Sequence, residues 1–496
     1  MYLIGYDIGS SSIKAALVEA STGKTLSIKQ YPESEMEIIS KQTGWAEQQP
    51  EVWWDNVKIA TERLLEETKV NPADIKSIGI SYQMHGMVLV DKDYQVLRPS
   101  IIWCDSRAVE VGNRAFEEIG AEKCLTHLLN SPGNFTASKV KWVKDHEPEV
   151  YARIHKMLLP GDFIALRMTD RACTTVSGLS EAMLWDFKNE NVASFLLENY
   201  GINESLIPEI VNTVGDQGTL TQAAADFLGL AVGTQVSYRA GDQPNNAMSL
   251  NVLNPGEIAA TGGTSGVVYG IVDKPQVDPK TRVNPFIHVN HTSSDPRIGI
   301  LLCVNGAGIQ YSWMKQMLAS EGTTYEEIER LAATAPVNSD GLRVIPFGNG
   351  AERILENENV GSQVINLHFN THKKAHLYRA ALEGIAYSFI YGVEIMQHIG
   401  MEVSVIKVGN DNLFQSAIFS NTISNVLGCK IEMLDATGAV GAAKASGVGI
   451  GFYQSLGEAF EKVVPVKVYE NGQDRAAYQA GYKLWKTDLE KILAKN

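Results

Sequence analysis

Short apolar segments separated by turn-forming residues recur along the whole chain. The first two, residues 2–7 and 13–19, lie on either side of a glycine and serine turn, which predicts a β-hairpin. Apolar segments of similar length predict further strands. These are expected at residues 75–82, 87–90, 236–240, 258–260, 267–272, 298–304, 342–346 and 403–408.

Helical periodicity is clearest between residues 375 and 398. Apolar residues recur there every three or four positions, at Leu382, Ile385, Phe389, Val393 and Met396. Gly400 follows, and glycine is common where a helix ends. A second helix is expected after Pro50, because proline suits the first helical turn. Strands that alternate with helices predict mixed α/β layers.

The length of the chain predicts two domains. At 496 residues it exceeds the size, roughly 250 to 300 residues, at which one hydrophobic core stops growing. A local pattern also repeats, because the polar turns at residues 7–12 and 261–266 each lie between two apolar strands. We therefore expect domains at residues 1–247 and 248–496, with both turns at a shared cleft.

Charge and composition argue against several function classes. The formal net charge of −14 disfavours a nucleic acid or an anionic membrane as partner. No segment has the ~18 consecutive apolar residues of a membrane span, and the N-terminus reads as a strand without signal-peptide features, so a cytoplasmic protein is expected. The five cysteines are scattered, which predicts reduced thiols.

Three histidines have the spacing closest to that of a metal site. His368, His372 and His376 are four residues apart, a spacing that would place them on one face of a helix. Lysines lie between them and no carboxylate accompanies them. A solvated surface is therefore expected there instead of a metal site.

The two polar turns are candidates for phosphate binding. Backbone N–H groups and short hydroxyls can surround phosphate oxygens where no bulky side chain intervenes. Ser10, Ser11 and Ser12 occupy the first turn and Thr264 the second. One hydroxyl-rich turn is usually structural, but two in matching strand contexts favour phosphate binding.

Three polar residues at the ends of predicted strands are candidates for chemistry. Asp242 could orient a hydroxyl and accept its proton during phosphoryl transfer, although an aspartate after a strand is often a turn former or a helix cap. Asp7 has the same structural alternative, with a magnesium-associated role as the functional one. His85, beside Gly86, could bind sugar hydroxyls or be a structural histidine.

Together these motifs resemble those of the FGGY carbohydrate kinases over nearly the whole chain, most closely the family members that phosphorylate D-xylulose. The Met84-His85-Gly86 segment resembles their ketose-contacting segment, whereas glycerol kinases carry an arginine-containing sequence there. Further matching segments lie at residues 6–14, 44–48, 97–99, 103–107, 135–139, 262–266, 306–310 and 439–443.

The resemblance implies both a fold and a reaction. Two ribonuclease H-like domains of the actin/hexokinase-like ATPase type, each a mixed five-stranded sheet flanked by helices, would enclose a ligand cleft. A small-molecule ketose would meet ATP and Mg²⁺ there, with D-xylulose the expected sugar and a homodimer allowed. The alternatives are L-ribulose, L-fuculose, L-rhamnulose or glycerol as substrate, or a non-catalytic nucleotide-dependent binding protein of the same fold.

The same match implies the site residues. Asp242 is the implied general base, and Asp7 is the residue expected near magnesium. The implied substrate-binding residues are Met84, His85, Gly86, Asp242 and Gln243. The implied nucleotide-binding residues are Ser10, Ser11, Ser12, Thr264, Gly306, Gln310, Gly409 and Asn412, although the turn at residues 409–412 has one glycine where the family has several. Asp105 and Arg107 either contact the substrate or pair with each other.

Overall fold

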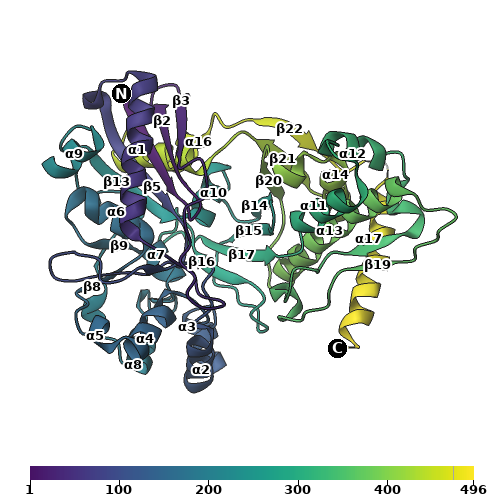
Figure 1. The fold of residues 1–496 in the computed structure, drawn as a ribbon, viewed down its shortest axis with the longest axis horizontal. Coiled ribbons are helices and arrows are strands. Elements are labelled where there is room, and N and C mark those ends of the chain that lie inside the picture. The colour runs from purple at the N-terminus through teal and green to yellow at the C-terminus, as the bar shows by residue number, and fades with distance from the viewer. Residues whose placement is uncertain (473, 496) are drawn as a thin grey trace.

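Two β-sheets organise the chain, one in each half, with helices around them (Figure 1). The computed structural model describes residues 1–472 and 474–495. The first sheet has the strand order β13-β5-β1-β2-β3. Its strands are β1 (Tyr2–Ile8), β2 (Ile13–Glu19), β3 (Thr25–Tyr31), β5 (Ile75–Tyr82) and β13 (Gln235–Gly241). β1, β2 and β3 pair antiparallel, whereas β5 and β13 run parallel to β1.

The second sheet repeats this arrangement and extends it. Its strand order is β16-β17-β15-β14-β20-β21-β22. The strands are β14 (Glu257–Gly262), β15 (Gly266–Val272), β16 (Asn284–Ile287), β17 (Ile298–Val304), β20 (Val405–Gly409), β21 (Lys430–Leu434) and β22 (Pro465–Tyr469). β14, β15 and β17 pair antiparallel, and β20 and β21 run parallel to β14. The central five strands therefore have the order and directions of the first sheet.

The two outer strands, β16 and β22, depart from the expected five-stranded sheet of the second half. Each lies at an edge and pairs antiparallel with one neighbour. Pro285 lies inside β16 and Pro465 begins β22. Proline has no N–H to donate, so it is tolerated at sheet edges but weakens the sequence pattern of a strand. That is why these two strands were not predicted.

Every strand and helix that the apolar pattern predicts is present. The predicted helices are α13 (Lys374–His398) and α1 (Pro50–Thr68), and α1 begins with its proline. The other helices of eight or more residues are α2 (Val109–Ile119), α4 (Thr136–His146), α6 (Pro160–Thr169), α10 (Asp242–Ser249), α11 (Gly308–Leu318), α12 (Tyr325–Ala332), α14 (Ala417–Leu427), α15 (Gly438–Gly449) and α17 (Arg475–Leu493). Shorter helices used below are α3 (Ala121–His127), α7 (Val176–Glu181), α9 (Gln222–Leu228) and α16 (Leu456–Phe460).

The histidine series does not share one helical face. Only His376 lies in α13, whereas His368 and His372 belong to the turn before it. The three rings still lie near one another, and His376 Nε2 is 3.1 Å from Asp340 Oδ2. Among residues 1–472 and 474–495, no group of three or more His, Cys, Asp or Glu side chains could hold a metal ion.

Helix α15 comes late in the sequence but packs on the first sheet. It lies against β1, β5 and β13, and it also contacts α10. The backbones approach closely because the facing positions are glycines. A Cβ on Gly5 would lie 2.0 Å from the Ala439 carbonyl oxygen, and one on Gly79 would lie 2.0 Å from the Ala442 carbonyl oxygen. The packing around the first sheet thus combines strands from the first half of the sequence with a helix from near its end. None of the helices in the described parts of the chain is long and apolar enough to cross a membrane.

The contact between α15 and the first sheet leads to a stability prediction. Gly79→Ala should lower the free energy of unfolding by about 1–3 kcal/mol, because the added methyl group must displace the α15 backbone. Urea unfolding followed by tryptophan fluorescence measures the change. Gly457→Ala in α16 is the control, since its added Cβ would have no neighbour closer than 3.6 Å. Equal stability of the two variants would contradict this account of the packing.

Candidate active site

The two predicted polar turns are both hairpin turns at corresponding places in the two sheets. The first joins β1 to β2 and the second joins β14 to β15. In the first turn, the carbonyl oxygens of Ser10 and Ser11 accept hydrogen bonds from Gln48 Nε2 at 2.7 Å and from the Met36 amide at 2.9 Å. In the second turn, Thr264 is exposed. The predicted repeat of hairpins is therefore confirmed.

The second turn is fixed by the segment that begins α11. The amides of Gly308 and Ile309 donate to the carbonyl oxygens of Gly263 and Thr264, each at 3.0 Å. Just before them, the amides of Asn305 and Gly306 donate to the carboxylate of Glu352, at 3.0 and 2.9 Å. Burial raises the pKa of Glu352 to about 7. A buried carboxylate thus holds the segment that positions the turn.

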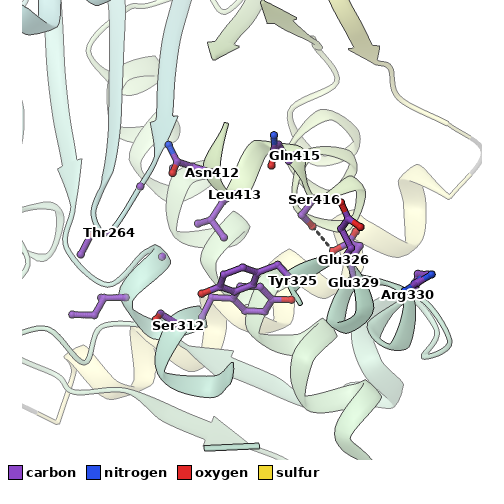
Figure 2. A pocket seen from close by; sticks show the side chains of 15 residues that line it. Thr264, Ser312, Tyr325, Glu326, Glu329, Arg330, Asn412, Leu413, Gln415 and Ser416 are labelled. Atoms are coloured by element: carbon purple, nitrogen blue, oxygen red, sulfur yellow. Dashed lines mark hydrogen bonds between the residues drawn. The ribbon is translucent and has the colours of Figure 1, made fainter. Parts of the chain in front are cut away.

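A cavity of about 770 Å³ opens beside the second turn (Figure 2). Its walls are the turn itself, α11, α12, the short helix η5 (Asn412–Gln415) and the start of α14. The rings of Tyr311 and Tyr325 stack on this wall with centroids 5.7 Å apart. Thr264 and Asn412 lie at one end and Arg330 at the other. The volume is in the range of small-molecule sites, roughly 300–1,000 Å³.

Only some of the expected nucleotide-binding residues line this cavity. Thr264 and Asn412 line it, whereas Gly306, Gln310 and Gly409 do not. The N–H group of Gly306 donates a hydrogen bond to Glu352, and the side chain of Gln310 is buried. The serines of the first turn belong to the other half of the molecule.

Sequence reasoning missed the wall that α12 supplies. Tyr325, Glu326, Glu329 and Arg330 line the cavity from an ordinary amphipathic helix without a glycine or hydroxyl motif. Glu329 also accepts hydrogen bonds from Ser416 Oγ at 2.8 Å and from the Ile418 amide at 3.0 Å. It therefore joins α12 to the start of α14, and no local sequence signal indicates this contact.

Two carboxylates meet at the carboxyl edge of the first sheet. Asp7 lies near the end of β1 and accepts a hydrogen bond from Ser81 Oγ at 3.0 Å. Asp242 is the first residue of α10, directly after β13, and Gly241 occupies the N-cap position. Burial raises the pKa of both groups, and the charge of Asp7 helps to raise that of Asp242 to about 7. Asp242 and Gln243 are both partly exposed.

The turn after β5 brings the expected sugar-contacting residues to the same edge. Met84 is buried and packs on Gly241, where a Cβ would lie 2.5 Å from Met84 Cγ. The His85 ring packs edge-on against Phe135, with centroids 4.7 Å apart, and near Phe286 of β16 at 5.4 Å. Burial and the charge of Lys139 lower the pKa of His85 to about 3, so the ring is neutral.

Lys139 holds this turn through its hydrogen bonds. Its ammonium group donates to the carbonyl oxygens of His85 at 2.7 Å and of Ile102 at 3.0 Å. The side chain is fully buried, and burial lowers its pKa to about 7. The segment containing Ile102 is thereby tied to the segment containing His85.

Asp105 and Arg107 form a buried ion pair. Arg107 Nη2 lies 2.7 Å from Asp105 Oδ2, and Arg107 Nη1 lies 2.7 Å from Glu47 Oε1. The guanidinium also lies over the ring of Trp45, 3.8 Å from its centroid. Both side chains of the pair are almost completely inaccessible, which favours the structural alternative over substrate contact.

Comparison with known proteins gives consistent matches over the whole chain. The N-terminal domain of the FGGY family of carbohydrate kinases matches residues 2–249, and the C-terminal domain of that family matches residues 258–450. A xylulose kinase of Bacillus subtilis (strain 168) is 29% identical over 501 residues, covering 98% of this chain and 96% of the relative.

Solved structures share the fold over nearly the full length. A xyloylose kinase from Brucella ovis has a TM-score of 0.89 at 24% identity and covers 100% of both chains. A gluconate kinase from Lactobacillus acidophilus also has a TM-score of 0.89, at 22% identity, covering 99% of this chain and 98% of its own. The fold alone therefore does not specify the sugar. With both domains of one family matched in order, the chain belongs to the FGGY family of carbohydrate kinases and is an ATP-dependent sugar kinase.

Proposed function

We propose that the protein phosphorylates D-xylulose to D-xylulose 5-phosphate, with ATP as the phosphate donor. The observation that carries the proposal is Asp242, a partly exposed carboxylate with a pKa of about 7 beside the Met84-His85-Gly86 turn. The name of the Bacillus subtilis relative, a xylulose kinase, supports xylulose as the sugar. Residues 1–247 would bind the sugar and supply the first phosphate turn, and residues 248–496 would bind the nucleotide.

Asp242 is the general base of the proposed reaction. It accepts the proton of the terminal hydroxyl of the ketose as that oxygen bonds to the γ-phosphorus of ATP. The bond between the γ-phosphorus and the oxygen of ADP breaks in the same transfer. A base works best when its pKa lies near the working pH, and a pKa of about 7 meets that condition. Gln243 and His85 hold other hydroxyls of the sugar.

The nucleotide occupies the cavity beside the second turn. Thr264 and Asn412 contact its phosphates, and the stacked rings of Tyr311 and Tyr325 lie along the wall that receives the rest of the nucleotide. Ser10, Ser11 and Ser12 approach the transferring phosphoryl group from the first half. Gly306 and Gly409 act through the backbone geometry of neighbouring turns, and Gln310 from within α11.

Asp7 is the residue that would hold magnesium. Its carboxylate is partly exposed at the edge where the phosphates arrive, and Gly438 leaves space near Asp7 Oδ2. Magnesium favours oxygen ligands, keeps several waters and needs only one or two carboxylates besides phosphate oxygens. The residues therefore fit the ion. When bound, it would neutralise charge on the phosphate oxygens.

The choice of sugar is tested by a substrate panel. D-xylulose should give the highest kcat/KM when ADP release is measured with D-xylulose, L-ribulose, D-ribulose, L-fuculose, gluconate and glycerol. The expectation follows from Met84-His85-Gly86 together with Asp242-Gln243. A clear preference for glycerol, gluconate or a deoxyketose would overturn the sugar assignment and leave the kinase assignment intact.

Asp242→Asn should reduce turnover by roughly 10²- to 10⁴-fold, the usual contribution of general-base catalysis.

For the wild type, kcat/KM should fall as the pH drops below about 7, because protonation of Asp242 removes the base. The folded pKa exceeds that of a free carboxyl, so ionising Asp242 costs stability as the pH rises from about 4 to about 7. The variant should therefore keep or raise its Tm at pH 8.

Asp226→Asn on the exposed face of α9 is the matched control and should keep full turnover. Turnover and thermal unfolding are measured on the same preparations. An Asp242→Asn enzyme that retains more than about a tenth of wild-type turnover would argue against the general-base role.

Thr264→Val should weaken the use of MgATP more than the binding of sugar. The substitution removes the hydroxyl of a residue that lines the cavity and changes the side-chain volume little. Calorimetry gives the affinity for each ligand separately. If the affinity for ATP and the turnover are both unchanged, Thr264 is not a phosphate contact.

A further inference from the structure

A buried glutamate lies against the turn that contains Met84, His85 and Gly86. Glu181 is the last residue of α7 and is 1% exposed. Buried carboxylates are rare unless they have partners. In the parts of the chain that the structure describes, no lysine or arginine lies within ion-pair distance of Glu181, and its partner is His85.

Three contacts join Glu181 to His85. Glu181 Oε2 accepts the His85 backbone N–H at 2.8 Å, and the same oxygen lies 3.3 Å from His85 Nδ1. The main-chain carbonyl oxygen of Glu181 lies 3.0 Å from Nδ1. A carbonyl oxygen can only accept a hydrogen bond, so Nδ1 carries the hydrogen. In a neutral ring, Nε2 is then an acceptor.

The backbone of His85 needs this support. Its φ is 62°, in the left-handed region that non-glycine residues seldom adopt. The bond from its N–H to Glu181 Oε2 holds that conformation from one side, and Lys139 holds the carbonyl oxygen from the other. Both main-chain polar groups of His85 are therefore bound by buried side chains.

The other carboxylate oxygen reaches the residue before Asp242. A Cβ on Gly241 would lie 3.1 Å from Glu181 Oε1, an oxygen that is buried and has no hydrogen-bond partner in the described structure. Burial raises the pKa of Glu181 well above its usual range, and the charges of Asp242 and Asp162 add to the effect. Burial therefore disfavours a second negative charge next to Asp242.

We propose that Glu181 is a positioning residue that fixes the conformation and tautomer of His85, so that His85 Nε2 accepts a hydrogen bond from a sugar hydroxyl. The inference rests on the proposed role of His85 in sugar binding. Glu181 is too buried to touch the substrate and acts on it through His85. The site then selects a sugar that presents a hydroxyl hydrogen to Nε2.

Two substitutions separate the parts of this proposal. Glu181→Leu keeps much of the side-chain volume but leaves the His85 N–H without its acceptor, whereas Glu181→Gln keeps an acceptor oxygen. Leu should raise KM for the ketose by roughly 10- to 100-fold, the effect of leaving one buried hydrogen bond unmade. Gln should restore KM to within about threefold, and KM for MgATP should not change in either variant.

The controls distinguish failure of this inference from failure of the proposed function. Asp186→Asn removes a carboxylate from the His127–Asp186 pair near the end of α3, and it should leave KM for the ketose unchanged. His85→Asn should raise that KM. If it does not, His85 does not contact the sugar and the proposed function loses that contact. If His85→Asn raises KM but Glu181→Leu does not, only the positioning role is overturned.

A measurement without substrate covers the case in which Glu181→Leu does not fold. In ¹⁵N-histidine-labelled wild-type protein, the His85 signals, assigned by their loss in His85→Asn, should show a protonated Nδ1 and an unprotonated Nε2. The reverse tautomer would overturn the proposal. A Glu181→Gln enzyme with a KM for the ketose as high as that of His85→Asn would also overturn it.

Discussion

The parallel pairing of β1 with β5, and of β5 with β13, is the constraint on which the site depends. Parallel strands end at the same edge of a sheet, so the residues that follow them gather there although they are far apart in sequence. Asp7, the turn containing His85, and Asp242 come from three such strand ends. The second sheet obeys the same rule, with β20 and β21 parallel to β14 and the cavity of about 770 Å³ beside the turn that follows β14.

Burial disfavours the charged forms of several groups in both halves of the site. The protein carries a formal net charge of −14, which would repel an anionic nucleotide. The pKa values of Asp242, Glu181 and Glu352 are raised chiefly by burial, and those of His85 and Lys139 are lowered by the same cause. Burial therefore disfavours the charged form of each of these groups, anionic and cationic alike.

The sequence pattern predicted those structural features that depend on residues close together in the sequence. Strand alternation, the hairpin turns and the periodicity of α13 are local properties, and the structure contains all of them. The missing information concerns contacts between distant segments. Glu352 holds the segment at Asn305, Glu181 holds His85, and α12 supplies a wall of the cavity, yet none has a sequence signature. Both Thr264 and Gly306 were predicted as nucleotide contacts. The structure distinguishes them, because Thr264 lines the cavity whereas the Gly306 amide donates to the distant Glu352.

The position of α15 affects how the chain is made. A division between residues 247 and 248 assigns this helix to the second half, yet its packing partners are strands of the first sheet. Domains commonly fold one after another as they leave the ribosome. Here the face of β1 and β5 around Gly5 and Gly79 stays uncovered until residues 438–449 have been synthesised. During translation, all five strands of the first sheet are therefore made long before the helix that covers them, and a chain released before residue 438 lacks that cover.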